Sequence, residues 1–123
     1  MDETALSLKL HAVMLGVRDV DVAASFYAEK LGFTLGGRFG EFAFVDAGGT
    51  MLVLSGDLAR ARPRAGPEPV EVVLAVDAVG EAYRRLRARG VTFQNEPHPI
   101  DGVNHVANFE DPDGHRFSLY GPP

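Results

Sequence analysis

One carboxylate stands out among the residues that could do chemistry. Glu71 is the only charged residue in the apolar run PVEVVLAV. Burying an unpaired carboxylate is costly, so a residue of this kind usually has a partner. Glu71 could bind a cationic group of a ligand, accept a hydrogen bond, or act as a general base if burial raises its pKa. The alternative is structural: a solvent-exposed strand end, or an ion pair with an arginine such as Arg116.

A serine and several histidines are the other candidates. Ser118 lies within the predicted strand RFSLY. No histidine and acid are predicted beside it, so a serine–histidine–acid relay is not expected. His105, in GVNHVANF, either lines a pocket or is an ordinary half-buried histidine. His98 is expected in a solvated loop and His115 at an exposed turn. The sequence therefore assigns no catalytic residue.

Composition narrows the class of protein. A chain of 123 residues with 46% hydrophobic and 24% charged residues is typical of one globular domain. The absence of cysteine excludes disulfides, thiolate ligands and thiol nucleophiles. The net charge of −5 disfavours nucleic-acid binding. Neither a signal peptide nor an apolar run of the roughly 20 residues needed to span a membrane is present, which predicts a cytoplasmic protein.

The second part of the sequence repeats the first. Residues 46–56 (DAGGTMLVLSG) align without a gap on residues 111–121 (DPDGHRFSLYG), pairing aspartates, glycines and leucines. Two positions earlier, the alignment pairs Phe44 with Phe109. Each segment is predicted to be a turn that leads into a strand. The two halves of the chain should therefore have the same architecture.

The upstream segments 13–33 and 72–93 also correspond. Each is predicted to form a strand, a helix beginning after an aspartate, and a turn at a glycine. An aspartate can cap a helix N-terminus, and glycine suits the positive φ of a helix C-terminus. The residues at these positions are Asp19 and Asp77, and Gly32 and Gly90.

The sequence thus predicts an α+β fold made of two βαβββ modules, whose curled mixed sheets surround a cleft. Strands are expected after the helices at 33–38, 41–46, 51–55, 91–95, 103–109 and 116–120. We expect one domain over 1–123, divided into a first module at 8–56, a linker without helix at 57–69 and a second module at 70–121.

Strand alternation predicts which side chains face the cleft. One face of each strand is bulky and suits the helices, whereas the other is smaller and mixed. A concave apolar surface with few polar groups is typical of small-molecule pockets. Phe42 and Phe44 would suit a planar or apolar guest, unless they belong to the core. The predicted ligand-binding residues are Met14, Phe44, Val53, Glu71, Val73, His105, Ser118 and Tyr120.

Two segments resemble a known superfamily. GVRDVDVAASFYAEKLGF (16–33) and FEDPDGHRFSLYG (109–121) resemble the vicinal oxygen chelate proteins. These include glyoxalase I, extradiol dioxygenases, fosfomycin-resistance enzymes and bleomycin-resistance proteins. The resemblance covers the chain from about residue 8 and implies the same two-module fold. It does not imply one activity, because many chemistries share that fold.

The resemblance also implies where a metal would be bound. Enzymes of the superfamily usually hold a divalent metal with His or Glu side chains, near the start of the first strand and late in the fourth strand of each module. Those positions are Ala12, Val53, Glu71 and Ser118. One carboxylate does not replace the three or four converging ligands that a metal needs. His11 is one residue out of register and should point to the helix side or the sheet edge. We expect a site without metal or other cofactor.

These expectations favour a metal-free protein that sequesters an organic compound, antibiotic-like or cationic, as the bleomycin-resistance branch does. The first alternative is a metal-dependent lyase, isomerase or dioxygenase, which needs His11, Glu71 and a further ligand to converge. The second is a metal-independent isomerase or epimerase with Glu71 as base. Similar proteins are commonly homodimers, with the cleft in some completed by the partner. We expect a small-molecule ligand and a homodimer, with no nucleic-acid or membrane partner.

Overall fold

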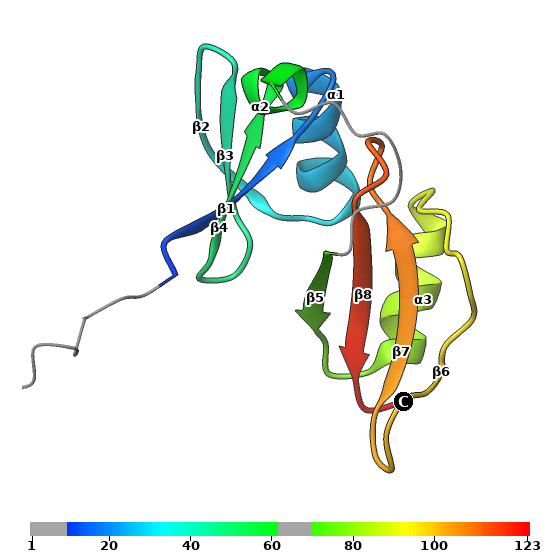
Figure 1. Ribbon diagram of the computed structural model, residues 1–123. Helices are drawn as coiled ribbons and strands as arrows, with labels where there is room; N and C mark the ends of the chain where they lie inside the picture. The colour runs from blue at the N-terminus through cyan, green and yellow to red at the C-terminus, as the bar shows by residue number, and fades with distance from the viewer. Residues whose placement is uncertain (1–9, 62–69) are drawn as a thin grey trace, which may run out of the picture.

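The fold consists of two four-stranded sheets, each with one face covered by a helix (Figure 1). The computed structural model describes residues 10–61 and 70–123. The first module contains β1 (Ala12–Gly16), α1 (Val20–Ser25), the π-helix η1 (Phe26–Lys30), β2 (Thr34–Phe39), β3 (Phe42–Asp46), β4 (Met51–Ser55) and α2 (Gly56–Ala61). The second contains β5 (Glu71–Ala75), α3 (Val79–Ala88), β6 (His98–Pro99), β7 (His105–Glu110) and β8 (Arg116–Gly121).

Both sheets have the same topology. Their strand orders are β1-β4-β3-β2 and β5-β8-β7-β6. In each, the outer first strand runs parallel to the last strand, and the other pairs are antiparallel. The predicted α+β fold of two βαβββ units with mixed sheets is confirmed. The sheets remain separate and do not close into a barrel. No helix of the described residues is long and apolar enough to cross a membrane.

The predicted helix ends are correct at three of four positions. Asp19 caps α1 by accepting hydrogen bonds from the backbone N–H groups of Asp21 and Val22. Gly32 and Gly90 have positive φ angles of 76° and 93°. The predicted cap at Asp77 is wrong, because α3 begins after Ala78, which makes no side-chain capping bond.

The structure departs from the predicted elements in two connections. Helix α2 occupies the first residues of the predicted linker, and Ser55 Oγ accepts a hydrogen bond from Leu58 N at its start. The rest of that linker, 62–69, lies outside the described residues. Residues 91–95 do not form the predicted strand: Phe93 makes only an isolated bridge to Phe109, and β6 forms further along at His98–Pro99.

The gapless repeat is one residue out of register in the third strand of each module. Val45 pairs with Leu52, and the corresponding pair in the second module is Phe109 with Phe117. The turn after Glu110 is one residue longer than the turn after Asp46. Alternation therefore places Phe109 in the core, whereas Phe44 lies on the opposite face.

One cluster of buried side chains draws on the helix-facing sides of both sheets. It includes Val45 and Leu54 from the first module and Phe109 and Phe117 from the second. The Phe109 and Phe117 rings stack with centroids 5.3 Å apart, and Phe117 lies 5.9 Å from the ring of Tyr27. Tyr27 therefore joins the aromatic cores of the two modules.

Tyr27 also makes a buried polar contact across the modules. Its hydroxyl donates to Asp111 Oδ2 over 2.8 Å, and His115 Nδ1 lies 2.6 Å from the same oxygen. Asp111 Oδ1 accepts the backbone N–H groups of Asp113 and His115. The predicted exposure of His115 is wrong, since its side chain is 13% exposed and that of Asp111 is fully buried.

The environment of Asp111 keeps the carboxylate ionised. Burial alone would raise its pKa, but the hydrogen bond and charge of His115, its backbone N–H and the Tyr27 hydroxyl together lower the pKa below the ordinary value of 3.8. Burial and the adjacent carboxylate raise the pKa of Tyr27, so its hydroxyl stays protonated as a donor. Arg18 reinforces the junction from outside, donating to Asp113 Oδ1 over 3.0 Å and to the Pro112 carbonyl over 2.6 Å.

We expect Tyr27→Phe to lower the free energy of unfolding by about 1.5–3 kcal/mol, because it removes a buried hydrogen bond to a charged acceptor. Urea unfolding at pH 7 measures this loss, and Val22→Ala on the exposed face of α1 is the control. A Tyr27→Phe variant as stable as the wild type would contradict the role of this contact.

The pH dependence of the free energy of unfolding should follow from the lowered pKa of Asp111. Its stabilising contribution is present above the unfolded-state pKa of about 4 and is lost as the pH falls through the lower folded-state pKa. In urea titrations between pH 6 and pH 2, Asp111→Asn should lose less stability with acid than the wild type. Parallel curves for the two proteins would show that another group controls acid unfolding.

Candidate functional site

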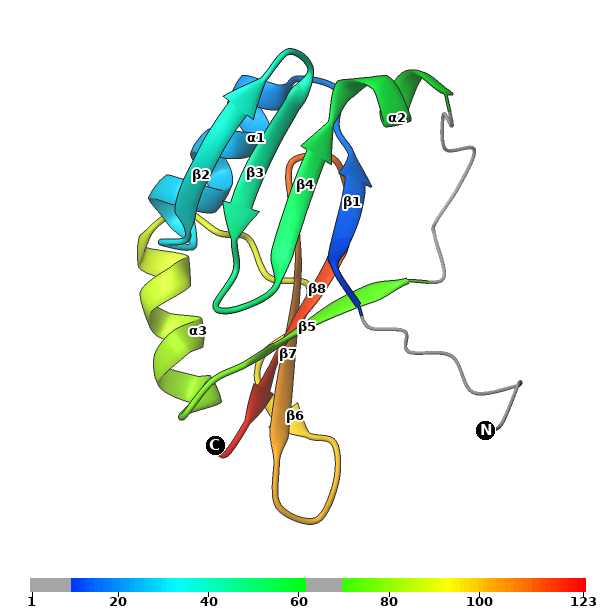
Figure 2. The same cartoon turned by 90° about the vertical axis from the view of Figure 1, so that its left-hand side faces the viewer.

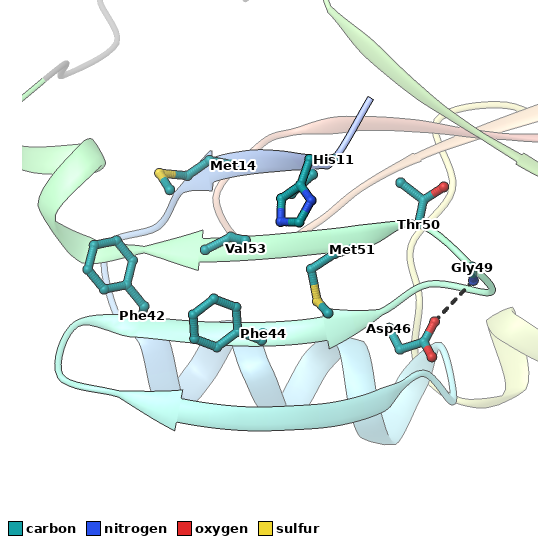
Figure 3. A pocket seen from close by; sticks show the side chains of 10 residues that line it. His11, Met14, Phe42, Phe44, Asp46, Gly49, Thr50, Met51 and Val53 are labelled. Atoms are coloured by element: carbon teal, nitrogen blue, oxygen red, sulfur yellow. Dashed lines mark hydrogen bonds between the residues drawn. The ribbon is translucent and has the colours of Figure 1, made fainter. Parts of the chain in front are cut away.

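The face of the first sheet opposite α1 is turned toward the viewer in Figure 2. It forms a hollow of about 610 Å³, whose lining side chains are drawn in Figure 3. Strand pairing arranges this face in three rows across the sheet. The first row consists of Ala12, Met51 and Asp46. The second row consists of Met14, Val53 and Phe44, and the third of Gly16, Ser55 and Phe42. The floor of the hollow is thus apolar and aromatic, with the Phe42 and Phe44 rings standing on β3 (Figure 3).

Polar side chains of the hollow gather at the Asp46 end. His11, Asp46 and Thr50 line this end, beside Met51 (Figure 3). Asp46 Oδ1 accepts the backbone N–H groups of Gly48 and Gly49, over 3.0 and 3.1 Å. Of the two predicted directions of His11, the helix side is wrong: His11 precedes the edge strand β1, which begins at Ala12, and it lines the hollow on the uncovered face.

The uncovered face of the second sheet is polar instead. Its rows contain Glu71, Arg116 and Glu110; Val73, Ser118 and Asn108; and Ala75, Tyr120 and Val106. These residues correspond to the floor of the hollow in the first sheet. The two uncovered faces therefore differ in chemistry although the backbone topology is the same.

Glu71 is engaged by side chains of its own sheet. Its Oε1 accepts a hydrogen bond from Arg116 Nε, and Asn108 Nδ2 lies 3.5 Å away. Arg116 Nη1 donates in turn to Gln94 Oε1 over 3.1 Å. The alternative of an Arg116 ion pair thus describes Glu71 in this structure. The contact from Asn108 crosses β8 at Ser118, whose small, buried side chain leaves room for it.

Tyr120 is fixed by the loop between β6 and β7. Its hydroxyl donates to Asp101 Oδ2 and accepts from Asn104 Nδ2, each over 2.9 Å. The backbone N–H groups of Asn104 and Val103, followed by the Tyr120 hydroxyl, lower the pKa of Asp101 to about 2. The loop therefore holds an ionised carboxylate against the hydroxyl of Tyr120 on β8.

The structure divides the predicted ligand-binding residues into groups. Met14, Phe44 and Val53 line the hollow of the first sheet. The uncovered face of the second sheet contains Glu71, Val73, Ser118 and Tyr120. His105 lies on the opposite face of β7, the same face as Ala107 and Phe109. All residues that line the hollow belong to the first module, so the hollow is not a cleft between the two sheets.

Asp46 and Thr50 line the hollow but are not among the predicted ligand-binding residues. The sequence pattern predicts Asp46 only as the start of a turn, although it follows Phe42 and Phe44 at a spacing of two residues. That alternation was the signal that could have assigned it to the hollow.

The four positions of the superfamily's metal ligands are also divided between the sheets. Ala12 and Val53 line the hollow, whereas Glu71 and Ser118 lie on the second sheet. Residues 10–61 and 70–123 contain no group of three or more His, Asp or Glu residues placed to hold a metal ion. The carboxylate at one of these positions already binds a guanidinium group.

Fold and sequence together define the family. The chain belongs to the glyoxalase/bleomycin resistance protein/dioxygenase superfamily, whose family model matches residues 9–119. It is 31% identical to the uncharacterized protein YurT of Bacillus subtilis (strain 168), over 91% of this chain and 98% of YurT.

Solved structures show the same fold. A glyoxalase/bleomycin resistance protein/dioxygenase from Nocardioides superposes with a TM-score of 0.81 at 26% identity, covering 98% of this chain and 87% of the other. Lactoylglutathione lyase from Agrobacterium tumefaciens gives a TM-score of 0.76 at 19% identity and covers 92% of both chains. The likeness to the lyase concerns the fold alone.

We expect the Glu71–Arg116 pair to contribute less than about 1 kcal/mol to stability, because both side chains are partly exposed and water screens their charges. A double-mutant cycle with Glu71→Gln and Arg116→Gln measures the coupling by urea unfolding, and the exposed Glu81–Arg85 pair provides the comparison. A coupling above about 3 kcal/mol would indicate a desolvated pair instead.

Proposed function

We propose that the protein binds a small organic compound in the hollow of the first sheet without using a metal. The observation that supports this most directly is the floor of the hollow, where two phenylalanines, two methionines and a valine gather around about 610 Å³. That volume is within the usual range for ligand pockets, about 300–1,000 Å³. We propose a ligand of a size that fits this volume, and antibiotic-like compounds are among the candidates.

The chemistry of the floor favours a ligand with a planar apolar part. Aromatic rings such as Phe42 and Phe44 interact well with other rings in stacked or edge-to-face geometry. The flexible thioether side chains of Met14 and Met51 can adapt to an irregular shape. The ligand would thus be held by burial of apolar surface, with the polar groups at the Asp46 end fixing its orientation.

Sequestration is favoured over catalysis by the state of Glu71. As a general base, Glu71 would need a free carboxylate facing the substrate, whereas its Oε1 accepts from Arg116 and Asn108. A metal bound there would have to displace the Arg116 guanidinium. The hollow contains a histidine and an aspartate, but its lining shows neither a serine nor a cysteine nucleophile.

Binding of a neutral fluorophore tests this proposal. N-phenyl-1-naphthylamine should bind with enhanced fluorescence, and Phe44→Ala should weaken its affinity about 10- to 100-fold, because truncating a buried ring removes on the order of 1.5–3 kcal/mol of apolar contact. The control is Val103→Ala, at an apolar residue that is 75% exposed in the β6–β7 loop. No binding, or equal loss in both variants, would refute the hollow as the site.

Metal uptake separates sequestration from the metal-dependent alternative. After dialysis against Zn²⁺, Ni²⁺, Mn²⁺ and anaerobic Fe²⁺, elemental analysis should find far less than one equivalent per chain, because the two modules do not present a converging ligand set. Stoichiometric metal that is lost in both His11→Ala and Glu71→Ala would support a lyase, isomerase or dioxygenase instead.

We also propose that a homodimer covers the hollow. Met14 and Val73, on the uncovered faces of the two sheets, are 47% and 58% exposed. A second copy could bury both by placing its polar second sheet opposite the first sheet of its partner. Light scattering should then give twice the chain mass, and Val73→Asp should shift the protein toward monomer; a monomeric wild type would refute the proposal.

A further inference from the structure

The hollow of the first sheet has an uneven distribution of charge. Among the ten residues that line it, Asp46 supplies the only carboxylate, and His11 is the only other residue with an ionisable side chain. No ion-pair partner of Asp46 is found within 10–61 and 70–123. The carboxylate is therefore a net negative charge at one end of an otherwise apolar surface.

The position of Asp46 is fixed by the turn that follows it. Its Oδ1 accepts the backbone N–H groups of Gly48 and Gly49, and its main chain pairs with Met51 on one side and Thr34 on the other. These bonds hold the carboxylate at the end of β3 without neutralising it. Asn at this position can make the same two bonds through its amide oxygen, so charge and turn can be separated by mutation.

Asp46 and the two phenylalanines share one face of β3. Residues two apart on a strand are about 7 Å apart, so Phe44 lies about 7 Å and Phe42 about 14 Å from Asp46 along the strand. A guest of two or three fused rings that lies over Phe44 would reach the carboxylate with one end. The row of Asp46 also contains Met51, and the next row contains Met14.

The other groups of the hollow favour the same sign of charge. The face of a phenyl ring is the negative part of its quadrupole and attracts cations. Thioether sulfur and hydroxyl oxygen can each accept from a positively charged donor. Of the lining residues, only a protonated His11 would oppose this preference.

We propose that the compound bound in the hollow is a planar aromatic cation, with its rings over Phe44 and its positive group at Asp46. This inference rests on the proposed function and adds the charge and orientation of the ligand. The counter-ion of the ligand is then Asp46 and not Glu71, because Glu71 is already paired with Arg116. Binding should accordingly weaken with salt, as expected for an exposed charge contact.

Three acridines of nearly equal shape test the charge preference at pH 8. 9-Aminoacridine is cationic, acridine neutral and acridine-9-carboxylate anionic at this pH. We expect 9-aminoacridine to bind about tenfold more tightly than acridine, and the carboxylate to bind more weakly than either, as measured by calorimetry.

Asp46→Asn should remove most of the preference for 9-aminoacridine over acridine and leave the affinity for acridine unchanged. The control is Asp57→Asn, which removes the same charge from the exposed helix α2 outside the hollow. Circular dichroism and the melting temperature of the Asp46→Asn variant verify that the turn is intact.

The outcomes distinguish this inference from the proposed function. If acridine and N-phenyl-1-naphthylamine bind but 9-aminoacridine shows no advantage, or keeps it in Asp46→Asn, the hollow binds ligands and the charge preference is refuted. If the naphthylamine binds and no acridine does, the planar cation is refuted. If none of these compounds binds, both the proposed function and the inference fail.

Discussion

The buried carboxylate of Asp111 determines how the two halves of the chain meet. It binds the hydroxyl of Tyr27 from the first module and the imidazole of His115 from its own turn, in the position where the aromatic cores of the modules join. A carboxylate without these partners would be costly to bury, so the contact favours one arrangement of the modules. In that arrangement the helix-facing sides of both sheets share one core. The other face of each sheet is left uncovered, and the hollow is a consequence of this arrangement.

The uncovered faces have the same topology but different chemistry. In the first sheet, the row of Met14, Val53 and Phe44 offers only apolar and aromatic groups. The corresponding row of the second sheet contains Ser118 and Asn108, and the neighbouring Glu71 and Arg116 bond with each other. The second sheet has thus satisfied its polar groups internally, whereas the first leaves its apolar groups accessible. This difference accounts for the apolar floor of the hollow on the first module although the fold is duplicated.

Much of the fold could be predicted because it depends on local patterns. Alternation and capping correctly located Asp19, Gly32 and the strands around β4 and β8. The gapless repeat misplaced Phe44 against Phe109, because one extra residue in the second turn changes the face of every residue on the strand before it. His115 and Asp111 could not be assigned to the core, since their burial depends on Tyr27, 84 residues from Asp111 in the sequence. The division of the site residues between two surfaces is likewise a matter of tertiary packing.

The comparison of Glu71 and Asp46 shows why a residue type does not define a role by itself. Glu71 attracts attention in the sequence because it interrupts an apolar run, yet the same parity that exposes it also places Arg116 opposite it on β8. Asp46 looks ordinary at the start of a glycine-rich turn, and its hydrogen bonds there are ordinary too. Backbone donors fix a carboxylate without supplying a full opposite charge, whereas a guanidinium supplies one. Of these two carboxylates, Glu71 therefore has a cationic partner within the described residues, whereas Asp46, next to the aromatic floor, has none.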